Sequence, residues 1–198
     1  MRQMFLPGAG GSAGFWKPLG DRLPGGVARR YFSWPGLGDE PPDPGVRGID
    51  DLVALVVAAL DEAPADLIAQ SMGGVVAVRA ALARPGRVRR LVLAATSGGV
   101  PVADLGGADW RGDYRAAYPH AAGWIAEPQP DFSARLGELA MPCLLLWGGA
   151  DPISPPAVGR RLLELLPDAR LHVVADGAHD LAVTHAATLA PVVAAFLG

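Results

Sequence analysis

Cysteine is almost absent from this chain of 198 residues, which contains only one, Cys143. A single cysteine excludes a disulfide within the chain and fits a reducing compartment. Cys143 opens the apolar run CLLLW over residues 143–147, where we expect a buried structural thiol and not a nucleophile. We therefore expect a cytoplasmic protein.

Long apolar runs are also missing. No stretch reaches the roughly 20 consecutive apolar residues that a membrane-spanning helix needs. The start of the chain has only Arg2 and a brief apolar piece before Pro7, a pattern unlike that of a secretory signal peptide. We expect a soluble protein without a membrane partner.

The chain also lacks an excess of positive charge. The chain has 17 lysines and arginines against 20 aspartates and glutamates, which gives a net charge of −3. Because no basic stripe runs along the sequence, we expect no nucleic-acid partner. One cluster of arginines follows the end of a predicted helix, where we expect it to interact with the helix dipole and not with phosphate. Its members are Arg84, Arg87, Arg89 and Arg90.

What the sequence does contain is an alternation of apolar strands and helices. Hydrophobic residues make up 51% of the chain and charged residues 19%, as in an ordered protein, and the length suits a single domain over residues 1–198. The predicted strands are Gln3–Leu6, Ala28–Trp34, Asp66–Gln70, Arg90–Ala95, Pro142–Trp147 and Ala169–Ala175. The predicted helices are Asp50–Glu62, Met72–Arg84, Ala157–Leu166 and about His185–Leu197, the last bent or delayed by Pro191. This order predicts an α/β fold, a mostly parallel sheet with helices on both faces.

One serine, Ser71, lies between the third strand and the long apolar helix that follows it. Residues 69–73 read AQSMG, and Gly73 and Gly74 allow the helix to start close against the strand end. The pattern resembles the G-x-S-x-G nucleophile elbow of the α/β-hydrolases, with alanine in place of the first glycine. The alternative is an ordinary strand-to-helix turn in which the serine is the N-cap.

The resemblance implies a Ser, Asp or Glu, His order along the chain. Asp151 is the candidate acid, since it follows the fifth predicted strand at the edge where such sheets collect their sites. Its alternative role is a helix N-cap, but Ser154 followed by Pro155 already supplies a cap. His179, just after the last strand, is the candidate base. The remaining histidines, His120, His172 and His185, do not lie at a strand's carboxyl end, and their spacing predicts no metal site.

The glycine-rich loop after the first strand, residues 7–16, is similar to the family's His-Gly-x-Gly oxyanion loop, with proline where histidine is usual. The resemblance implies that the N–H groups of Met72 and Ala9 stabilise the oxyanion, in a cradle completed by Gly8 and Gly10, with Gly10 as the alternative donor. Residues 8–13, GAGGSA, also match the dinucleotide fingerprint. However, no acid ends the next strand and Pro18 interrupts the following helix, so we expect no nucleotide and no other cofactor.

Residues 97–140 interrupt the alternation, since they contain no clean strand. They are rich in glycine, proline and aromatic residues, and in the resemblance they occupy the place of the hydrolase cap. We expect a short cap insertion within the single domain, with most of its aromatic side chains packing the insertion itself. Because the chain lacks the hairpin that usually precedes the oxyanion strand, we also expect a reduced sheet of six strands, with Ala28–Trp34 at an edge.

The chain thus resembles a small α/β-hydrolase of the esterase kind, similar to carboxylesterases and enol-lactonases. The resemblance implies a serine hydrolase that cleaves a small-molecule ester or thioester through an acyl-enzyme. Two alternatives stay open. One is a carbon–carbon bond hydrolase with the same fold and triad, and the other is a non-catalytic binding protein that uses the exposed edge strand.

Overall fold

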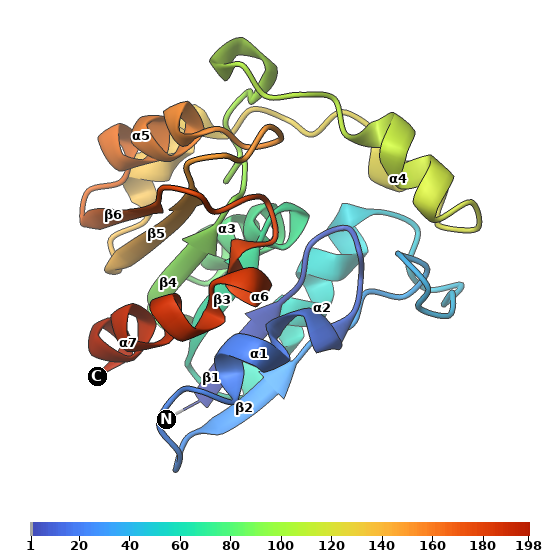
Figure 1. Ribbon diagram of the computed structural model, residues 1–198. Helices are drawn as coiled ribbons and strands as arrows, with labels where there is room; N and C mark the ends of the chain where they lie inside the picture. Colours follow the sequence, from blue (N-terminus) through green and yellow to red (C-terminus); the bar gives the residue numbers. More distant parts are fainter. Residues whose placement is uncertain (1) are drawn as a thin grey trace.

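A six-stranded sheet forms the centre of the molecule, for which a computed structural model describes residues 2–198 (Figure 1). Its strands lie in the order β2-β1-β3-β4-β5-β6, and every neighbouring pair is parallel, as predicted. The strand β2, which corresponds to the predicted segment Ala28–Trp34, lies at one edge of the sheet, as expected. The strands are β1 (Arg2–Leu6), β2 (Ala28–Tyr31), β3 (Ala65–Gln70), β4 (Val88–Ala94), β5 (Cys143–Gly148) and β6 (Ala169–Val174).

The edge strand β2 is shorter than predicted, since it ends at Tyr31 and not at Trp34. The amide of Phe32 still donates to the carbonyl of Phe5 in β1, at 2.9 Å. Two residues later the amide of Trp34 donates instead to Gly11, at 2.8 Å. The chain therefore turns from the sheet toward the loop that follows β1.

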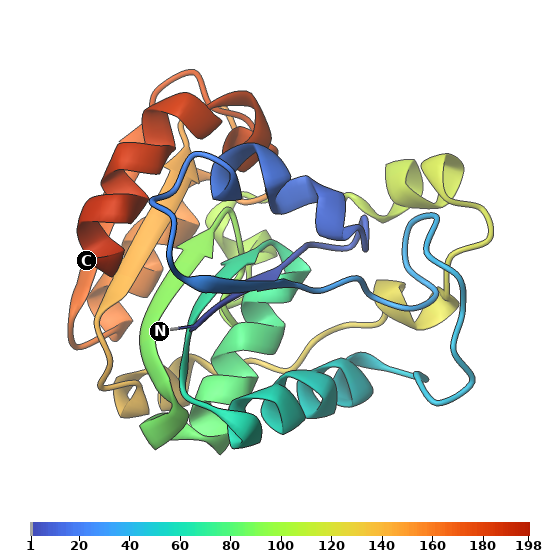
Figure 2. The same cartoon turned by 90° about the horizontal axis from the view of Figure 1, so that it is seen from below.

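Helices cover both faces of the sheet, as Figure 2 shows from below. The helices α2 (Ile49–Glu62), α3 (Met72–Ala83) and α5 (Pro156–Leu165) cover one face. The helices α1 (Lys17–Gly20), α6 (Leu181–Thr184) and α7 (Ala186–Leu197) cover the other. No helix among residues 2–198 combines the length and the apolar character needed to cross a membrane.

Pro191 lies inside α7 and does not delay its start, which was one of the two effects predicted for it. A proline inside a helix removes one backbone hydrogen bond and costs stability. Leu189, Val193 and Leu197 of the same helix are buried against the sheet. Burial of this apolar face offsets the cost, because tertiary packing supplies most helix stability in proteins.

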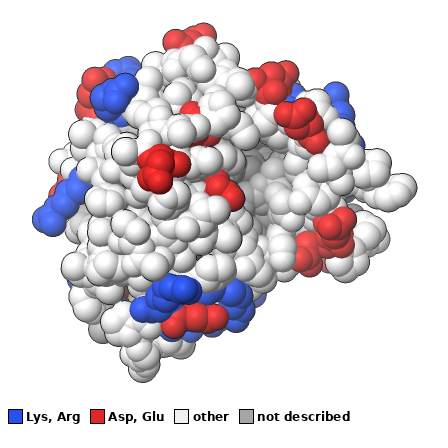
Figure 3. Space-filling model, viewed as in Figure 1, with Lys and Arg blue, Asp and Glu red and all other residues white. Residues whose placement is uncertain are grey.

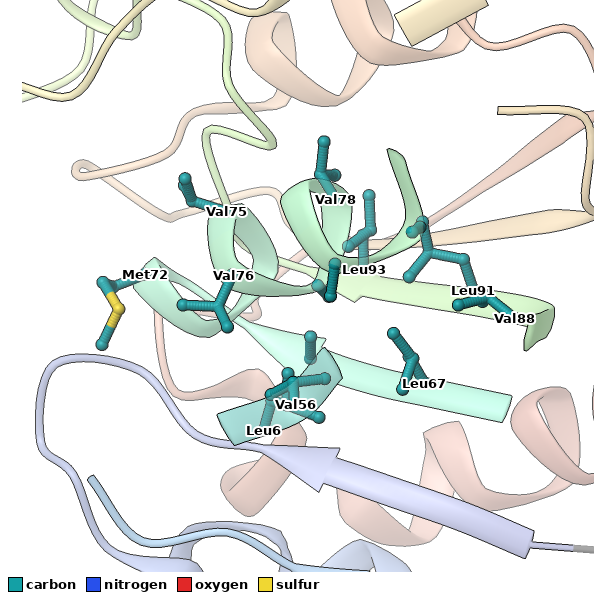
Figure 4. Close-up of a cluster of buried hydrophobic side chains, with 14 of the residues drawn as sticks. Leu6, Val56, Leu67, Met72, Val75, Val76, Val78, Val88, Leu91 and Leu93 are labelled. Carbon is teal, nitrogen blue, oxygen red and sulfur yellow. The ribbon is translucent and has the colours of Figure 1, made fainter. Parts of the chain in front are cut away.

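The core under α3 fixes where this helix begins. Strand β3 is buried along its whole length, and most of α3 is buried as well. Figure 4 shows Val76 of α3 pointing toward the side chains of Leu6 and Val56. The start of α3 is therefore held at the carboxyl end of the sheet, where β1 and β3 both finish.

The arginine cluster has two roles, of which only the first was predicted. Arg84 donates to the carbonyl of Ala83 at the end of α3, and Arg87 donates to Leu60 in the last turn of α2. Arg89 instead pairs at 2.9 Å with Asp66, whose side chain is only 2% exposed. A buried carboxylate is costly without a partner, which explains why this arginine does not serve a helix end.

Three 3₁₀ turns and one short helix make up the regular structure of residues 97–140. The segment contains no strand among its described residues, as predicted, and α4 lies apart from both helix layers (Figure 1). Its elements are η3 (Ala103–Leu105), α4 (Arg111–Ala117), η4 (Gly123–Ala126) and η5 (Ser133–Glu138). Two further turns lie elsewhere, η1 (Ala13–Trp16) before α1 and η2 (Pro85–Arg87) before β4.

Candidate active site

Ser71 lies in the turn between β3 and α3 in a conformation that non-glycine residues rarely adopt, with φ 53° and ψ −126°. Such a backbone costs free energy and persists only where its surroundings hold it. The amide of Ser71 donates to Ala94 at 3.0 Å. Although Ser71 occupies the N-cap position of α3, its side chain makes no capping hydrogen bond. The N-cap alternative therefore does not account for this serine.

The two glycines after Ser71 allow close approach, as the sequence predicts. A Cβ atom on Gly73 would overlap the carbonyl oxygens of Pro7 and Leu6, at the end of β1. A Cβ atom on Gly74 would overlap the side chain of Thr96, just after β4. Any larger residue at either position would push α3 away from the strand ends that surround Ser71.

The structure brings together the three side chains predicted as a triad. Nε2 of His179 lies 3.0 Å from Oγ of Ser71, and Nδ1 lies 2.8 Å from Oδ2 of Asp151. His179 lies in the loop between β6 and α6, and Asp151 follows β5. The side chain of Asp151 is fully buried, while that of His179 is 23% exposed. The imidazole thus connects a buried carboxylate to the hydroxyl at the turn.

Asp151 also has the turn-capping role that the sequence analysis assigned to Ser154, and that assignment was wrong. Oδ1 of Asp151 accepts hydrogen bonds from the amides of Ile153, at 2.9 Å, and Ser154, at 3.1 Å. The hydroxyl of Ser154 instead donates to the carbonyl of Thr96, and Pro155 is the N-cap of α5. One carboxylate therefore uses one oxygen for its own loop and the other for His179.

The other histidines lie away from this site. His172 is in β6, and His185 lies beside Asp176, with Nε2 at 3.4 Å from Oδ1. His120 is exposed in the 97–140 segment. No group of three or more potential metal ligands occurs within residues 2–198.

The loop after β1 is anchored by tryptophans where the family pattern has a histidine. Nε1 of Trp34 donates to the carbonyl of Pro7 at 2.7 Å, and Nε1 of Trp16 donates to that of Leu6 at 2.9 Å. Both indoles are fully buried. Sequence reasoning did not identify this anchor, because Trp34 lies 27 residues along the chain from the carbonyl that it contacts.

Three amides predicted as oxyanion donors have no hydrogen-bond acceptor within residues 2–198. They are those of Met72, the predicted first oxyanion donor, and of Ala9 and Gly10, the predicted alternatives for the second. Gly8 packs against the side chains of Gln70 and Ser71. An amide without an acceptor is able to donate to an anionic oxygen that comes within reach.

Gln70 contributes to the site and was not predicted. Its side chain is buried, and Nε2 donates to the carbonyl of His179 at 3.1 Å. The bond ties the end of β3 to the loop that holds the imidazole. A polar residue closing the apolar run of β3 is the signal that sequence analysis had available.

The 97–140 segment reaches the loop after β1 through α4. Trp110 and Tyr114 pack edge to face within the segment, as expected. Both, together with Trp124, are also partly buried against the main core, which was not predicted. A cavity of about 330 Å³ lies within the segment, and Tyr114, Tyr118 and Ile125 are among its lining residues. Figure 3 shows the molecule hollowed between its main body and α4, with a mostly uncharged surface inside the hollow and acidic side chains at its edge.

Cys143 is buried, as predicted, in the first position of β5. Burial raises the pKa of its thiol to about 12, with a smaller contribution from the negative charge of Asp168. A thiol that stays protonated is a poor nucleophile. Cys143 therefore takes no part in the site around Ser71.

A comparison with known families identifies the chain's relatives. The model of the alpha/beta hydrolase family matches residues 4–140, which include the loop after β1 and the turn at Ser71. The chain belongs to the alpha/beta hydrolase family. The predicted fold class is thereby confirmed, and this hydrolase has the six-stranded parallel sheet expected of it.

Two curated relatives and one solved structure illustrate the similarity. The hydrolase is 30% identical to the pimeloyl-[acyl-carrier protein] methyl ester esterase of Neisseria meningitidis serogroup B, over 93% of this chain and 88% of the esterase. It is 28% identical to polyketide synthase ThaQ of Burkholderia thailandensis over 99% of this chain, but it spans only 12% of that synthase. The meta-cleavage product hydrolase of Pseudomonas fluorescens IP01 has the same fold, with a TM-score of 0.79 and 20% identity. The matched region covers 100% of this chain and 90% of that one.

Proposed function

We propose that this hydrolase cleaves a carboxylic ester or thioester through an acyl-enzyme formed on Ser71. The observation that carries the proposal is the continuous line of hydrogen bonds from Ser71 through His179 to the buried Asp151. A serine hydroxyl is a weak nucleophile at neutral pH and needs an adjacent base that a third group orients. Similarity to a methyl ester esterase adds support for ester chemistry.

The first half of the reaction acylates the serine. Oδ2 of Asp151 accepts a hydrogen bond from Nδ1–H of His179, which leaves Nε2 unprotonated and able to take the proton of the Ser71 hydroxyl. Oγ of Ser71 then attacks the carbonyl carbon of the substrate. When the C–O or C–S bond breaks, Nε2 returns the proton to the leaving alcohol or thiol. The buried carboxylate stabilises the imidazolium between these two transfers.

The tetrahedral intermediate carries a negative charge on the former carbonyl oxygen. In this proposal the amides of Met72 and Ala9 donate to it, with Gly10 as the alternative second donor, and each well-placed donor contributes roughly 3–4 kcal/mol. In the second half, Nε2 of His179 takes a proton from water, whose oxygen attacks the acyl carbon. Nε2 then returns the proton to Oγ of Ser71 as the acyl C–Oγ bond breaks and the acid is released. The reaction consumes only water and needs neither a metal ion nor an organic cofactor.

The substrate of this proposal is a small acyl compound with an apolar portion. Tyr114 and Tyr118 of the 97–140 segment line the cavity beside α4, whose lining does not include the triad, and the surface inside the hollow in Figure 3 is mostly uncharged. We propose that residues 97–140 act as a short cap that contacts this apolar portion. A partner that is a nucleic acid or a membrane is not expected from the charge and hydropathy of the sequence.

The test uses a short p-nitrophenyl ester together with a fluorophosphonate label that reacts with activated serines. Wild type is expected to hydrolyse the ester and to take up one label, whereas Ser71→Ala is expected to do neither. Ser133→Ala, on η5, is the matched control and should behave as wild type. Labelling of another residue in Ser71→Ala would contradict the assignment.

A parallel assay separates the two rival functions. Wild type and Ser71→Ala are offered a vinylogous 1,5-diketone, the substrate type of carbon–carbon bond hydrolases. Cleavage of the diketone without cleavage of any ester or thioester would favour that function, although the similarity to the meta-cleavage product hydrolase shows the fold alone. A protein inert toward all of these compounds would favour a binding role.

A further inference from the structure

Two neighbouring strands end in the same unusual way. Ser71 after β3 and Ala95 after β4 have φ values of 53° and 45°. They are the only non-glycine residues with positive φ within residues 2–198. The two strands pair in register up to Gln70 and Ala94, so the strained residues lie side by side. Backbone strain at paired positions indicates that the surrounding structure requires both turns.

The turn at Ala95 places the side chain of Thr96 against the turn at Ser71. Oγ1 of Thr96 donates to the carbonyl of Ser71 at 2.5 Å and accepts from the amide of Gly98 at 3.0 Å. The carbonyl of Thr96 accepts from the hydroxyl of Ser154 at 3.1 Å. Thr96 is only 1% exposed. It thus lies in a buried network that joins the serine's turn to the loop of Asp151.

The carbonyl of Ser71 belongs to the same peptide unit as the amide of Met72. In a trans peptide the C=O and N–H bonds point in opposite directions, so fixing one fixes the other. The Ser71 carbonyl accepts from Thr96 on one side and from the amide of Gly74, at 2.9 Å, in the first turn of α3. These two donors set the direction in which the Met72 N–H points.

We propose that Thr96 is a positioning residue that orients the Met72 amide toward the oxyanion and holds the Ser71 turn against the acid loop. The inference rests on the function proposed above, and Thr96 itself touches no substrate. An oxyanion donor acts on the transition state and not on the bound ester. Misorienting it therefore lowers kcat and leaves KM nearly unchanged.

The experiment compares Thr96→Val, which keeps the shape and loses the hydroxyl, with Thr96→Ser, which keeps the hydroxyl. The matched control is Ser97→Ala, since the Ser97 side chain accepts from Gly99 in the same turn without contacting the elbow. Values of kcat and KM for a p-nitrophenyl ester are measured per site titrated with fluorophosphonate. The inhibition constant of a trifluoromethyl ketone, which forms an oxyanion on the serine, is measured alongside.

Thr96→Val is expected to lower kcat per titrated site about tenfold, less than the 10²–10³ for outright removal of a donor. It should raise the inhibition constant of the ketone by a similar factor, and KM should stay within about twofold of the wild-type value. Thr96→Ser and Ser97→Ala should stay within about twofold of wild type in all three quantities. If Thr96→Val does not fold, Thr96→Ala, which removes the same hydroxyl with less crowding at Gly74, is judged by the same criteria.

Two results would overturn the inference. One is a hydroxyl-free variant whose kcat and ketone affinity match wild type, and the other is Thr96→Ser with the same defect as Thr96→Val. In either case an active wild type leaves the proposed esterase function intact. If the wild-type protein hydrolyses no ester or thioester, the proposed esterase function is wrong, and the inference about Thr96 is wrong as well.

Discussion

The hydroxyl oxygen of Tyr114, on α4, lies 2.8 Å from the carbonyl oxygen of Ala9, in the loop after β1. The same phenol accepts a hydrogen bond from the amide of Gly38, at 3.0 Å. Burial raises the pKa of Tyr114, with the Gly38 amide opposing the shift, so the phenol remains a donor at neutral pH. One side chain of the 97–140 segment therefore ties together two loops of the main body.

Tyr114→Phe tests whether this tie supports activity. The change removes both bonds and leaves the Gly38 amide and the Ala9 carbonyl without a partner, which costs about 1–3 kcal/mol of unfolding free energy. We expect a lower melting temperature and a several-fold lower kcat/KM for a p-nitrophenyl ester. Tyr31→Phe is the control, since Tyr31 lies on the edge strand β2 and within residues 2–198 its hydroxyl makes no hydrogen bond. Equal losses in both variants would show that the contact with Ala9 has no special role.

Asp151 allows its two roles to be separated by two substitutions. Asp151→Asn keeps an oxygen for the amides of Ile153 and Ser154 but presents an amide group to His179. We expect near-normal stability with kcat lower by about 10⁴, the size of effect that the wrong imidazole tautomer produces in another serine hydrolase. Asp151→Ala should lose the turn as well and unfold at lower denaturant concentration.

Urea unfolding and ester hydrolysis measured on both variants provide the check. An Asp151→Asn protein that keeps most of its activity would exclude this carboxylate as the partner of the imidazole. An Asp151→Ala protein as stable as wild type would instead show that the Oδ1 contacts contribute little to the acid loop.

The sequence predicted the positions of the strands better than the contacts at their ends. Apolar runs were sufficient for the four central strands, because a parallel sheet covered on both faces requires continuous hydrophobic segments there. The edge strands β2 and β6 are less apolar and followed mainly from the alternation with helices. The end of β2 was misplaced by three residues, since Trp34 interacts with the loop after β1 and not with the sheet. That choice depends on a tertiary contact, which local composition does not encode.

At the site, the order of Ser71, Asp151 and His179 followed from the family pattern, and the structure places their side chains in contact. Thr96 could not be predicted, because the direction of its hydroxyl depends on the positive φ of Ala95, for which alanine gives no signal. The assignment of the helix cap to Ser154 failed for a related reason. As a cap, its hydroxyl would accept from an amide of α5, but in the structure it donates to the carbonyl of Thr96 after β4.

Cys143 predicts a specific dependence of stability on alkaline pH. Its folded-state pKa of about 12 lies above the value near 8.5 expected in the unfolded chain. Between these values the unfolded thiol ionises while the folded one stays protonated, so this stabilisation is complete below about pH 8.5 and declines as the pH rises. The slope reaches at most about 1.4 kcal/mol per pH unit.

Urea unfolding at pH 7 and pH 10 tests this dependence in wild type and Cys143→Ala. We expect the variant to lose less stability than wild type between the two pH values, although it is less stable at pH 7 because of the smaller side chain. Native wild type should also resist iodoacetamide at pH 8 and react once unfolded. Rapid alkylation of the native protein would contradict the burial of the thiol.

Trp34 and Trp16 provide a matched pair for testing how the loop after β1 is held. Trp34→Phe removes the donor to the Pro7 carbonyl, and Trp16→Phe removes the donor to the Leu6 carbonyl, one residue earlier and still within β1. Both indoles are fully buried, so each change should cost a comparable few kcal/mol of unfolding free energy through the lost bond and the cavity.

Only the Pro7 carbonyl lies in the loop that carries the proposed donor Ala9. We therefore expect Trp34→Phe to lower kcat per titrated site about tenfold, in line with weakened oxyanion stabilisation, and Trp16→Phe to lower it less than threefold. If the two variants are equally stable and equally active, the tryptophan anchor serves the fold alone.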